Sequence, residues 1–211
     1  MLLYSLVLLI VVSVVQSNNY DCYGDVTKLN PKGMAPRYGG LEASRRAIDR
    51  DIEEINKRLQ YYQKAAVLNC IHPAVIAGIA SRESGAGKYL YKTNGWGDFR
   101  NGTYHAYGIM QCDIYVDPLH YVGLNCTTYH WDSFDHINVQ TKYILVPYIL
   151  AVKKKFPSWT DEQTLQGGVA AYNFGVRNVR TWEHLDIGTT HNDYSNDVIA
   201  RAQWLIKRYN W

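Results

Sequence analysis

The sequence predicts an α+β fold that is predominantly α-helical, with a central buried helix and a small irregular β-sheet lining a cleft. Before residue 85 and after residue 135, apolar residues recur at the three- and four-residue spacing of amphipathic helices. Between residues 85 and 135 that period disappears, and glycine, asparagine, tyrosine and tryptophan suggest loops and short strands. A chain of 211 residues, 47% of them hydrophobic, can bury a sizeable core as a single domain.

The first 17 residues are predicted to be a secretory signal peptide. Residues 2–15 are almost entirely apolar, and Val15-Gln16-Ser17 supplies small-residue spacing for cleavage near Ser17. A membrane anchor is the alternative, but the apolar run is short for a bilayer span and no second segment of sufficient length follows. We therefore expect residues 18–211 to form one secreted, extracellular domain with no membrane partner.

The net charge and the cysteine content further limit the classes of protein to which the chain can belong. The formal net charge is only +3, far from the basic excess of nucleic-acid-binding proteins, so we expect no nucleic-acid partner. Four cysteines in a secreted chain indicate two disulfides, for which three pairings are possible. A free Cys112 beside Asp113 is the alternative.

The segment from Leu41 to Ala66 is predicted to be helical scaffold. Its apolar positions alternate at steps of four and three residues: Ile48, Ile52, Ile55, Leu59, Tyr62 and Ala66. This spacing fits one long amphipathic helix or two joined helices. A coiled coil is the competing interpretation, but the pattern covers only about three heptads and the charged residues are not segregated.

A helix from Pro73 to Ser84 places one carboxylate where solvation is poor. Proline suits the first helical turn, and Gly85 suits the left-handed position just past a helix end. Glu83 continues the apolar stripe of this helix, so it lies on the face that packs into the core. Burial and the helix dipole both disfavour the ionised form, so we expect a raised pKa for Glu83, as a general acid requires. A solvated helix end or a core ion pair is the alternative.

The loops that follow add two carboxylates and form the predicted cleft wall. Asp98 follows Asn94-Gly95-Trp96-Gly97, and Asp113 follows Gly108-Ile109-Met110-Gln111-Cys112. Aspartates in glycine-rich turns are usually turn formers, but beside a raised-pKa acid an ionised aspartate can activate water. Two N-glycosylation acceptors, Asn101 and Asn125, lie in the same region.

Three more helices are predicted in the second half of the chain. The segment from Ile137 to Val152 is apolar on nearly every side, so we expect a helix buried in the centre and kinked at Pro147. Thr160-Asp161-Glu162-Gln163 is a capping box that opens a helix ending at Tyr172-Asn173-Phe174-Gly175. The last helix should run from about Tyr194 to Arg208.

Five motifs follow one another along the chain. They are Ser81-Arg82-Glu83-Ser84, Gly95-Trp96-Gly97-Asp98, Gly108-Ile109-Met110-Gln111 with Asp113, Ala171-Tyr172-Asn173-Phe174-Gly175, and Asp186-Ile187-Gly188-Thr189-Thr190-His191. In this order they resemble the motifs of goose-type lysozymes, and the resemblance covers nearly everything after Asp21. It implies a lysozyme-like fold and hydrolysis of the β-1,4 bond between N-acetylmuramic acid and N-acetylglucosamine in peptidoglycan. No metal or cofactor is implied, chitooligosaccharides would be weaker ligands, and we expect a monomer.

The resemblance also implies roles for the three carboxylates. Glu83 would protonate the glycosidic oxygen as the bond breaks. Asp98 or Asp113 would position and activate the attacking water, by an inverting route, and the sequence does not rank the two.

Four further residues resemble substrate-side residues of the family. Tyr172 and Asn173 resemble saccharide-contacting residues, although a plain helix terminator would show the same pattern. Tyr194 resembles a substrate-side tyrosine. His136 resembles a histidine near the cleft, and a structural histidine is the alternative.

The disulfide pairing is also informed by the resemblance. Cys22 and Cys70 look like the family's bridge between the N-terminal arm and the start of the Glu83 helix. That leaves Cys112 and Cys126, whose pairing is our inference and is not carried over from the avian members of the family.

Two other functions remain open at this point. Lytic transglycosylases share similar motifs but cleave without water, and the presence of both Asp98 and Asp113 argues against them. A secreted peptidoglycan-binding protein without turnover is the other alternative, because residues 99–107 form a longer segment than is usual in the family. Retention of all three carboxylates, Glu83 included, argues against it.

Overall fold

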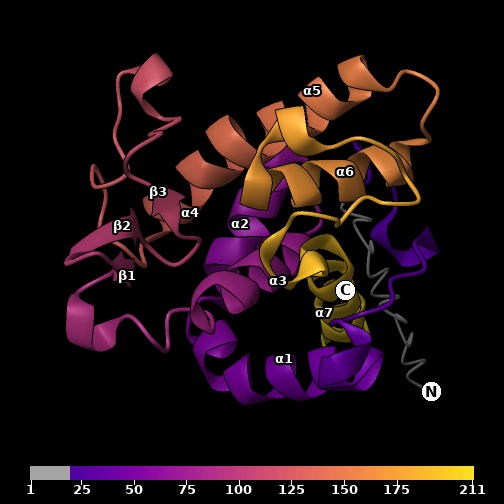
Figure 1. Cartoon of the computed structure of the whole chain (residues 1–211). Coiled ribbons are helices and arrows are strands. Elements are labelled where there is room, and N and C mark those ends of the chain that lie inside the picture. Colours follow the sequence, from indigo (N-terminus) through magenta and orange to yellow (C-terminus); the bar gives the residue numbers. More distant parts are fainter. Residues whose placement is uncertain (1–19) are drawn as a thin grey trace, which may run out of the picture.

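The computed structural model describes residues 20–211, so the predicted signal peptide at residues 1–17 lies outside the described residues. The described chain forms seven α-helices and one three-stranded antiparallel sheet (Figure 1). The elements are α1 (Gly40–Lys57), α2 (Leu59–Asn69), α3 (Pro73–Ser84), β1 (Trp96–Arg100), β2 (Thr103–Tyr107), β3 (Cys112–Asp113), α4 (Phe134–Gln140), α5 (Val146–Lys155), α6 (Asp161–Phe174) and α7 (Tyr194–Tyr209). The predicted α+β, predominantly helical architecture is confirmed. Among residues 20–211, no helix combines the length and the apolar character needed to cross a bilayer.

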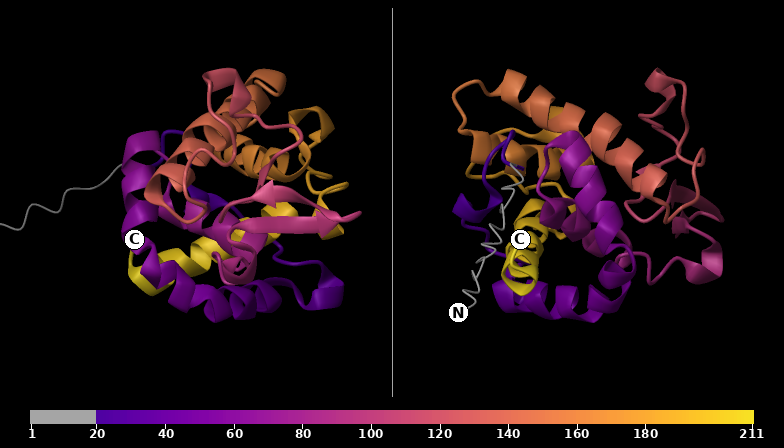
Figure 2. Two further views of the ribbon diagram at one scale, coloured as in Figure 1. Left: turned by 90° about the vertical axis from the view of Figure 1, so that its left-hand side faces the viewer. Right: turned by 180° about the vertical axis from the view of Figure 1, so that it is seen from behind.

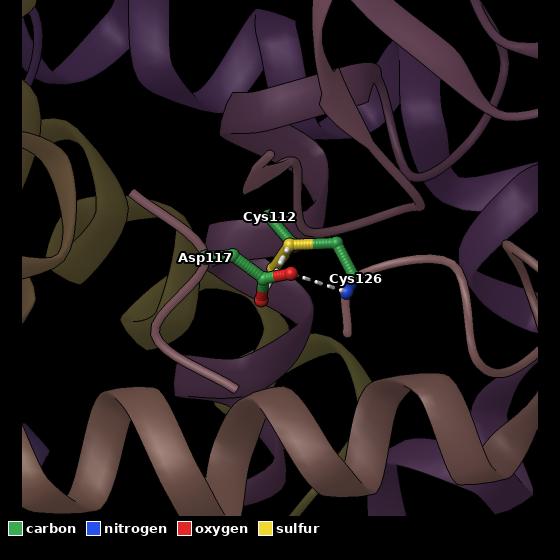
Figure 3. Close-up of side chains that lie close together, drawn as sticks. All are labelled: Cys112, Asp117 and Cys126. Atoms are coloured by element: carbon green, nitrogen blue, oxygen red, sulfur yellow. Dashed lines mark hydrogen bonds between the residues drawn. A yellow bond between two sulfur atoms is a disulfide. The ribbon is translucent and has the colours of Figure 1, made fainter. Parts of the chain in front are cut away.

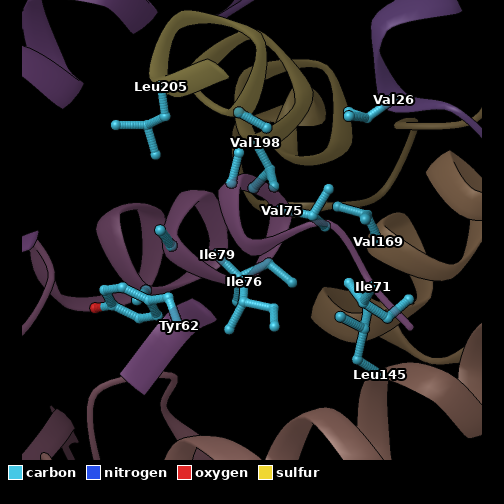
Figure 4. Close-up of a cluster of buried hydrophobic side chains, with 14 of the residues drawn as sticks. Val26, Tyr62, Ile71, Val75, Ile76, Ile79, Leu145, Val169, Val198 and Leu205 are labelled. Carbon is cyan, nitrogen blue, oxygen red and sulfur yellow. The ribbon is translucent and has the colours of Figure 1, made fainter. Parts of the chain in front are cut away.

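Helix α3 is the centre of the helical body. Ten of its 12 residues are buried, and its predicted stripe of Ile76 and Ile79 packs inside the largest cluster of apolar side chains (Figure 4). Val198 of α7 packs into the same cluster. A Cβ added at Gly78 would lie 3.0 Å from the carbonyl oxygen of Val198, so this glycine permits the close approach of α3 and α7. Glu83 is thereby carried on a helix that is packed on nearly every side.

The segment from Ile137 to Val152 is helical throughout, as predicted, but it is buried on only part of its surface. It is divided into α4, a π-helical stretch (Thr141–Leu145) and α5, and Pro147 lies in the first turn of α5. Helix α5 lies on the outside of the body, against α6, and leaves Leu150 51% exposed (Figure 1). The predicted burial on nearly every side was wrong, because Leu150 is exposed and Tyr148 lines the cleft.

The segment from Leu41 to Ala66 forms two joined helices, the second of the predicted alternatives. Helix α1 ends at Lys57 and α2 begins at Leu59, while Arg58 between them has φ −122° and ψ 14°. The Arg58 guanidinium is buried and donates hydrogen bonds to Glu54 (2.9 Å) and Asp132 (2.7 Å). Since Asp132 follows the sheet region in the chain, this ionic cluster joins the helical body to the segment that carries the sheet.

The sheet lies to one side of the helical body (Figures 1 and 2). β2 is its central strand and pairs antiparallel with both neighbours, with Phe99 of β1 opposite Tyr104 of β2. Asn101 and Gly102 connect these strands with φ values of 50° and 80°, the left-handed pair that a two-residue hairpin turn requires. The longer segment at residues 99–107 is therefore part of a β-hairpin, in which Asp98 of β1 has a left-handed backbone with φ 48°.

Both predicted disulfides are present. Cys22–Cys70 joins the N-terminal arm to the turn before α3, and Cys112–Cys126 closes a loop after β3. Figure 3 shows Asp117 against the second disulfide, where its carboxylate accepts a hydrogen bond from the backbone N–H of Cys126 (3.4 Å). These three side chains lie close enough to surround a metal ion, but both sulfurs are consumed in the disulfide and cannot act as thiolate ligands.

Candidate active site

A cleft of about 690 Å³ lies between the sheet and the helical body. The strands and the loop after β3 supply one wall, and α5, α6 and the loop before α7 supply the other. The lining includes Glu83, Asp98, Arg100, His105, Gln111, Asp113, Val116, Ile144, Tyr148, Tyr172, Asn173, Phe174 and Thr190. All three carboxylates that the sequence singled out are thus brought to one cavity.

Glu83 lies one residue before the C-terminal end of α3, where it is partly buried. The hydroxyl of Tyr194 donates a hydrogen bond to Oε1 of Glu83. Desolvation raises the pKa of Glu83 to about 7, and the charge of Asp98 adds to this, while the Tyr194 hydrogen bond and the positive charge of Arg82 act in the opposite direction. A carboxyl group with this pKa is protonated in a large fraction of molecules near neutral pH, as general acid catalysis requires.

The two aspartates differ in their surroundings. Asp98 forms an ion pair with Arg100 at 3.4 Å and lies near enough to Glu83 to raise the pKa of that carboxyl by charge repulsion. Asp113 instead accepts hydrogen bonds from two backbone amides of the following turn, at 2.8 and 3.2 Å. Asp113 therefore stabilises a turn in the cleft wall, whereas Asp98 is electrostatically coupled to Glu83.

Tyr172 and Asn173 lie in the last turn of α6, on the opposite wall. The Tyr172 hydroxyl lies 2.9 Å from the carbonyl oxygen of Met110 and 2.8 Å from Oε1 of Gln140. The Asn173 amide accepts from the backbone N–H of Thr190 (2.8 Å) and donates to its hydroxyl (3.2 Å). Both side chains are therefore held in place by the protein itself, which gives the cleft a preformed wall.

His136 does not reach the cleft lining. It is 1% exposed, and its Nε2 lies 2.6 Å from the amide nitrogen of Gln140. A Cβ added at Gly108 would lie 1.6 Å from that Nε2, so the ring fills the space beneath this glycine. Burial lowers the pKa of His136 to about 4, so the ring is neutral. These surroundings favour the structural histidine that the sequence left open as the alternative.

Tyr194 is also 1% exposed, and it lies behind Glu83 and not on the cleft surface. Its hydroxyl points at Glu83, and burial raises its pKa well above the ordinary value, so it remains a hydrogen-bond donor. The tyrosine predicted on the substrate side thus contacts Glu83 from the interior of the protein.

Several cleft residues were not among the predicted site residues. Arg100 lies two residues after Asp98 in β1, in the longer segment expected at the rim of the cleft, but no role was predicted for it. Thr190 belongs to the family-like motif at residues 186–191, although no role in the site was predicted for it. Tyr148 comes from a distant helix, and no local pattern marks it as a cleft residue.

Comparison with known proteins places the chain in a family. It matches the protein family described as Lysozyme g over residues 23–208. It is 44% identical to the Lysozyme g of Struthio camelus over 191 residues, which cover 87% of this chain and 86% of that protein. It is also 44% identical to the Lysozyme g of Gallus gallus, across 87% of this chain and 83% of that one. A protein of Lottia gigantea named "Glycine, glutamate and proline-rich protein" is 50% identical over 204 residues, covering 93% of this chain and 47% of that protein, so the chain spans about half the length of that relative. The chain belongs to the lysozyme g family.

Proposed function

We propose that this protein is a secreted lysozyme that hydrolyses the β-1,4 bond between N-acetylmuramic acid and N-acetylglucosamine in peptidoglycan. The observation that carries the proposal is the pairing of unlike carboxylates in one cleft. Glu83 has a pKa raised to about 7, and Asp98 lies close enough to contribute to that shift. Two carboxyl groups in different environments are the acid and the base that glycoside hydrolysis needs.

Glu83 donates its proton to the glycosidic oxygen while the bond from that oxygen to the anomeric carbon breaks. A water molecule attacks the same carbon from the opposite face of the sugar ring, and Asp98 accepts its proton. The sugar passes through an oxocarbenium-like state between these events. Proton exchange with solvent then restores protonated Glu83 and ionised Asp98.

The remaining cleft residues bind and orient the sugar chain. Tyr172 and Asn173 are fixed by hydrogen bonds on their protein side, and both line the cavity. Asp113 holds the turn of the opposite wall and assists in positioning the water. Chitooligosaccharides, which lack the lactyl and peptide groups of peptidoglycan, bind in the same cleft more weakly.

The protein acts outside the cell as a monomer. The Cys22–Cys70 and Cys112–Cys126 disulfides fit an oxidising compartment, in agreement with the signal peptide predicted for residues 1–17. A formal net charge of +3 favours approach to an anionic bacterial wall.

Glu83→Gln tests the proposal, because glutamine is nearly isosteric with glutamate but cannot donate the proton. We expect loss of turnover with retained folding and retained binding of chitooligosaccharide. Glu53→Gln, on the exposed face of α1 with its side chain 85% exposed, is the matched control and should lyse cells as the wild type does. Mass spectrometry of muropeptides from purified peptidoglycan supplies the product assay. Ordinary reducing ends support hydrolysis, whereas anhydro ends would indicate a transglycosylase and absence of cleavage a binding protein.

A further inference from the structure

Two consecutive residues at the end of α3 face two consecutive residues at the start of α7. Glu83 accepts the hydrogen bond from the hydroxyl of Tyr194. The residue before it, Arg82, forms an ion pair of 2.7 Å with Asp193, the residue before Tyr194. The catalytic contact and the ion pair therefore lie side by side and join the same two helices.

The Arg82 guanidinium is one of the most heavily bonded groups in the described part of the chain. Its side chain is 9% exposed, and those of its carboxylate partners Asp193 and Asp197 are 3% and 0% exposed. It also donates to the carbonyl oxygen of Thr190 at 3.1 Å, and its Cζ lies 5.6 Å from the centre of the Tyr194 ring. One planar, forked cation thus contacts the loop before α7 and the first turn of α7, which a lysine could not bridge together.

The same contacts extend to the cleft wall. Thr190, whose carbonyl group Arg82 holds, forms two hydrogen bonds with the side chain of Asn173, and both residues line the cleft. Asp193 uses its second oxygen to accept a 2.6 Å hydrogen bond from the backbone N–H of Ala35, which ties the N-terminal arm to the same point. Arg82 therefore contacts both the residue before Tyr194 and the Thr190 wall of the cleft.

We propose that Arg82 is a positioning residue for the general acid. Through Asp193 it holds Tyr194 against that acid, and through Thr190 it holds the wall formed by the end of α6 in place beside it. The proposal rests on Glu83 being the acid. Arg82 itself bonds to Asp193, Asp197 and Thr190, so it acts on the reaction through Tyr194 and through its charge. The charged and titratable groups that influence Glu83 are Arg82 from α3, Tyr194 from α7, Tyr172 from α6 and Asp98 from β1.

Arg82→Gln and Arg82→Lys test this role, with Arg201→Gln and Arg201→Lys as matched controls. Arg201 is also buried and also bonds to Asp197, but its other contacts are with Ser81 and Asp51, and it makes none with Asp193 or Thr190. Both arginines should support stability. Only the Arg82 variants should lower kcat on chitooligosaccharide, by about tenfold or more for glutamine, with KM changed far less. Lysine should restore part of the loss because it retains the charge.

The pH profile separates positioning from general destabilisation. Removing the cation at Arg82 should raise the pKa of Glu83, so the alkaline limb of the kcat profile should move to higher pH in Arg82→Gln and stay in place in the Arg201 variants. Asp193→Asn should give a similar loss of kcat, and the loss in the double variant with Arg82→Gln should be less than additive. If Arg82→Gln does not fold, the same kcat measurements on Asp193→Asn and Arg82→Lys test the proposal in its place.

The outcomes distinguish this inference from the proposed function. If Glu83→Gln is inactive but folded Arg82 and Asp193 variants keep the wild-type kcat and alkaline limb, Arg82 is purely structural and the inference fails alone. If the Arg201 variants reproduce the Arg82 effects, the inference also fails. If Glu83→Gln retains turnover, Glu83 is not the general acid, so the proposed function is contradicted and with it the inference that depends on that acid.

Discussion

The pKa of Glu83, the proposed general acid, is set by a balance between burial, which raises it, and two neighbouring groups, which lower it. Burial raises the pKa of its carboxyl to about 7, although the Tyr194 hydroxyl and the Arg82 charge both favour the ionised form. A general acid acts only while protonated, so turnover should fall as the pH rises through about 7. The alkaline side of the activity profile therefore reports on this one side chain.

Tyr194→Phe should shift that alkaline limb in a defined direction. The change removes a hydrogen bond that favours ionised Glu83, so the pKa of Glu83 rises and the limb moves to higher pH. At a pH where the acid is fully protonated, kcat should still fall about tenfold, because the carboxyl group loses the contact that orients it. The measurement is kcat against pH on a soluble chitooligosaccharide.

Tyr209→Phe is the control for this change. Its hydroxyl donates a hydrogen bond to Asn56 at 2.5 Å, at the far end of the same helix, and it is remote from the cleft lining. Its profile should match that of the wild type. An unshifted limb in Tyr194→Phe would mean that the hydrogen bond has no influence on the acid.

At the scale of elements, the helices with local signals could be predicted from sequence. Helix α3 begins at Pro73 and ends at Ser84 as predicted, with Gly85 in the left-handed conformation. The capping box of α6 is present with both of its hydrogen bonds, at 3.0 and 3.2 Å. In each case the signal is a residue type whose backbone or side chain satisfies the helix end. For the segment from Ile137 to Val152 the helix was predicted but its partial exposure was not, because apolar composition cannot distinguish core packing from the lining of a cleft.

The Cys22–Cys70 disulfide acts on stability at this scale. It closes a loop with a sequence separation of 48 residues, so the chain-entropy model assigns it about 4 kcal/mol. Replacing both cysteines by serine should lower the free energy of unfolding by about this amount, measured by denaturant titration under oxidising conditions.

The Cys112–Cys126 disulfide is the internal comparison. Its separation of 14 residues corresponds to about 3 kcal/mol in the same model, so its removal should cost less stability. Because its loop follows β3 in the cleft wall, its removal should also lower activity more than removal of Cys22–Cys70. Equal stability losses in the two double variants would contradict the loop-length argument.

At the scale of the whole molecule, the sequence indicated which carboxylates line the cleft better than it indicated which residues contact one another. The motifs marked Glu83, Asp98 and Asp113, and all three line one cleft. The contacts that set the properties of the acid could not be predicted, because they join positions far apart in the chain. Tyr194 lies 111 residues after Glu83, and no local pattern shows that its hydroxyl turns inward. For the same reason the sequence could not rank the two aspartates.

The stereochemistry of cleavage is a property of the assembled cleft. A retaining enzyme needs its second carboxylate as a nucleophile about 5 to 5.5 Å from the acid, whereas an inverting enzyme leaves room for water. Asp98 and Asp113 both come from the sheet side of the cleft, opposite the wall formed by α6. Neither carboxylate shares an element with Glu83, and we expect them to act on water by the inverting route.

The initial product should therefore be the α-anomer, formed from a β-linked substrate. Asp98→Asn should lower kcat on the order of 10²-fold, because it removes the carboxylate that accepts the proton of water. Asp113→Asn should lower it less, by under about tenfold, because the Asp113 carboxylate mainly accepts backbone hydrogen bonds that an asparagine oxygen can partly retain. Proton NMR of freshly cleaved chitooligosaccharide reads the anomer before mutarotation. A β-anomer as the first product would exclude inversion. A larger loss of kcat in Asp113→Asn than in Asp98→Asn would make Asp113 the base, because the carboxylate that activates water must account for the larger share of the rate.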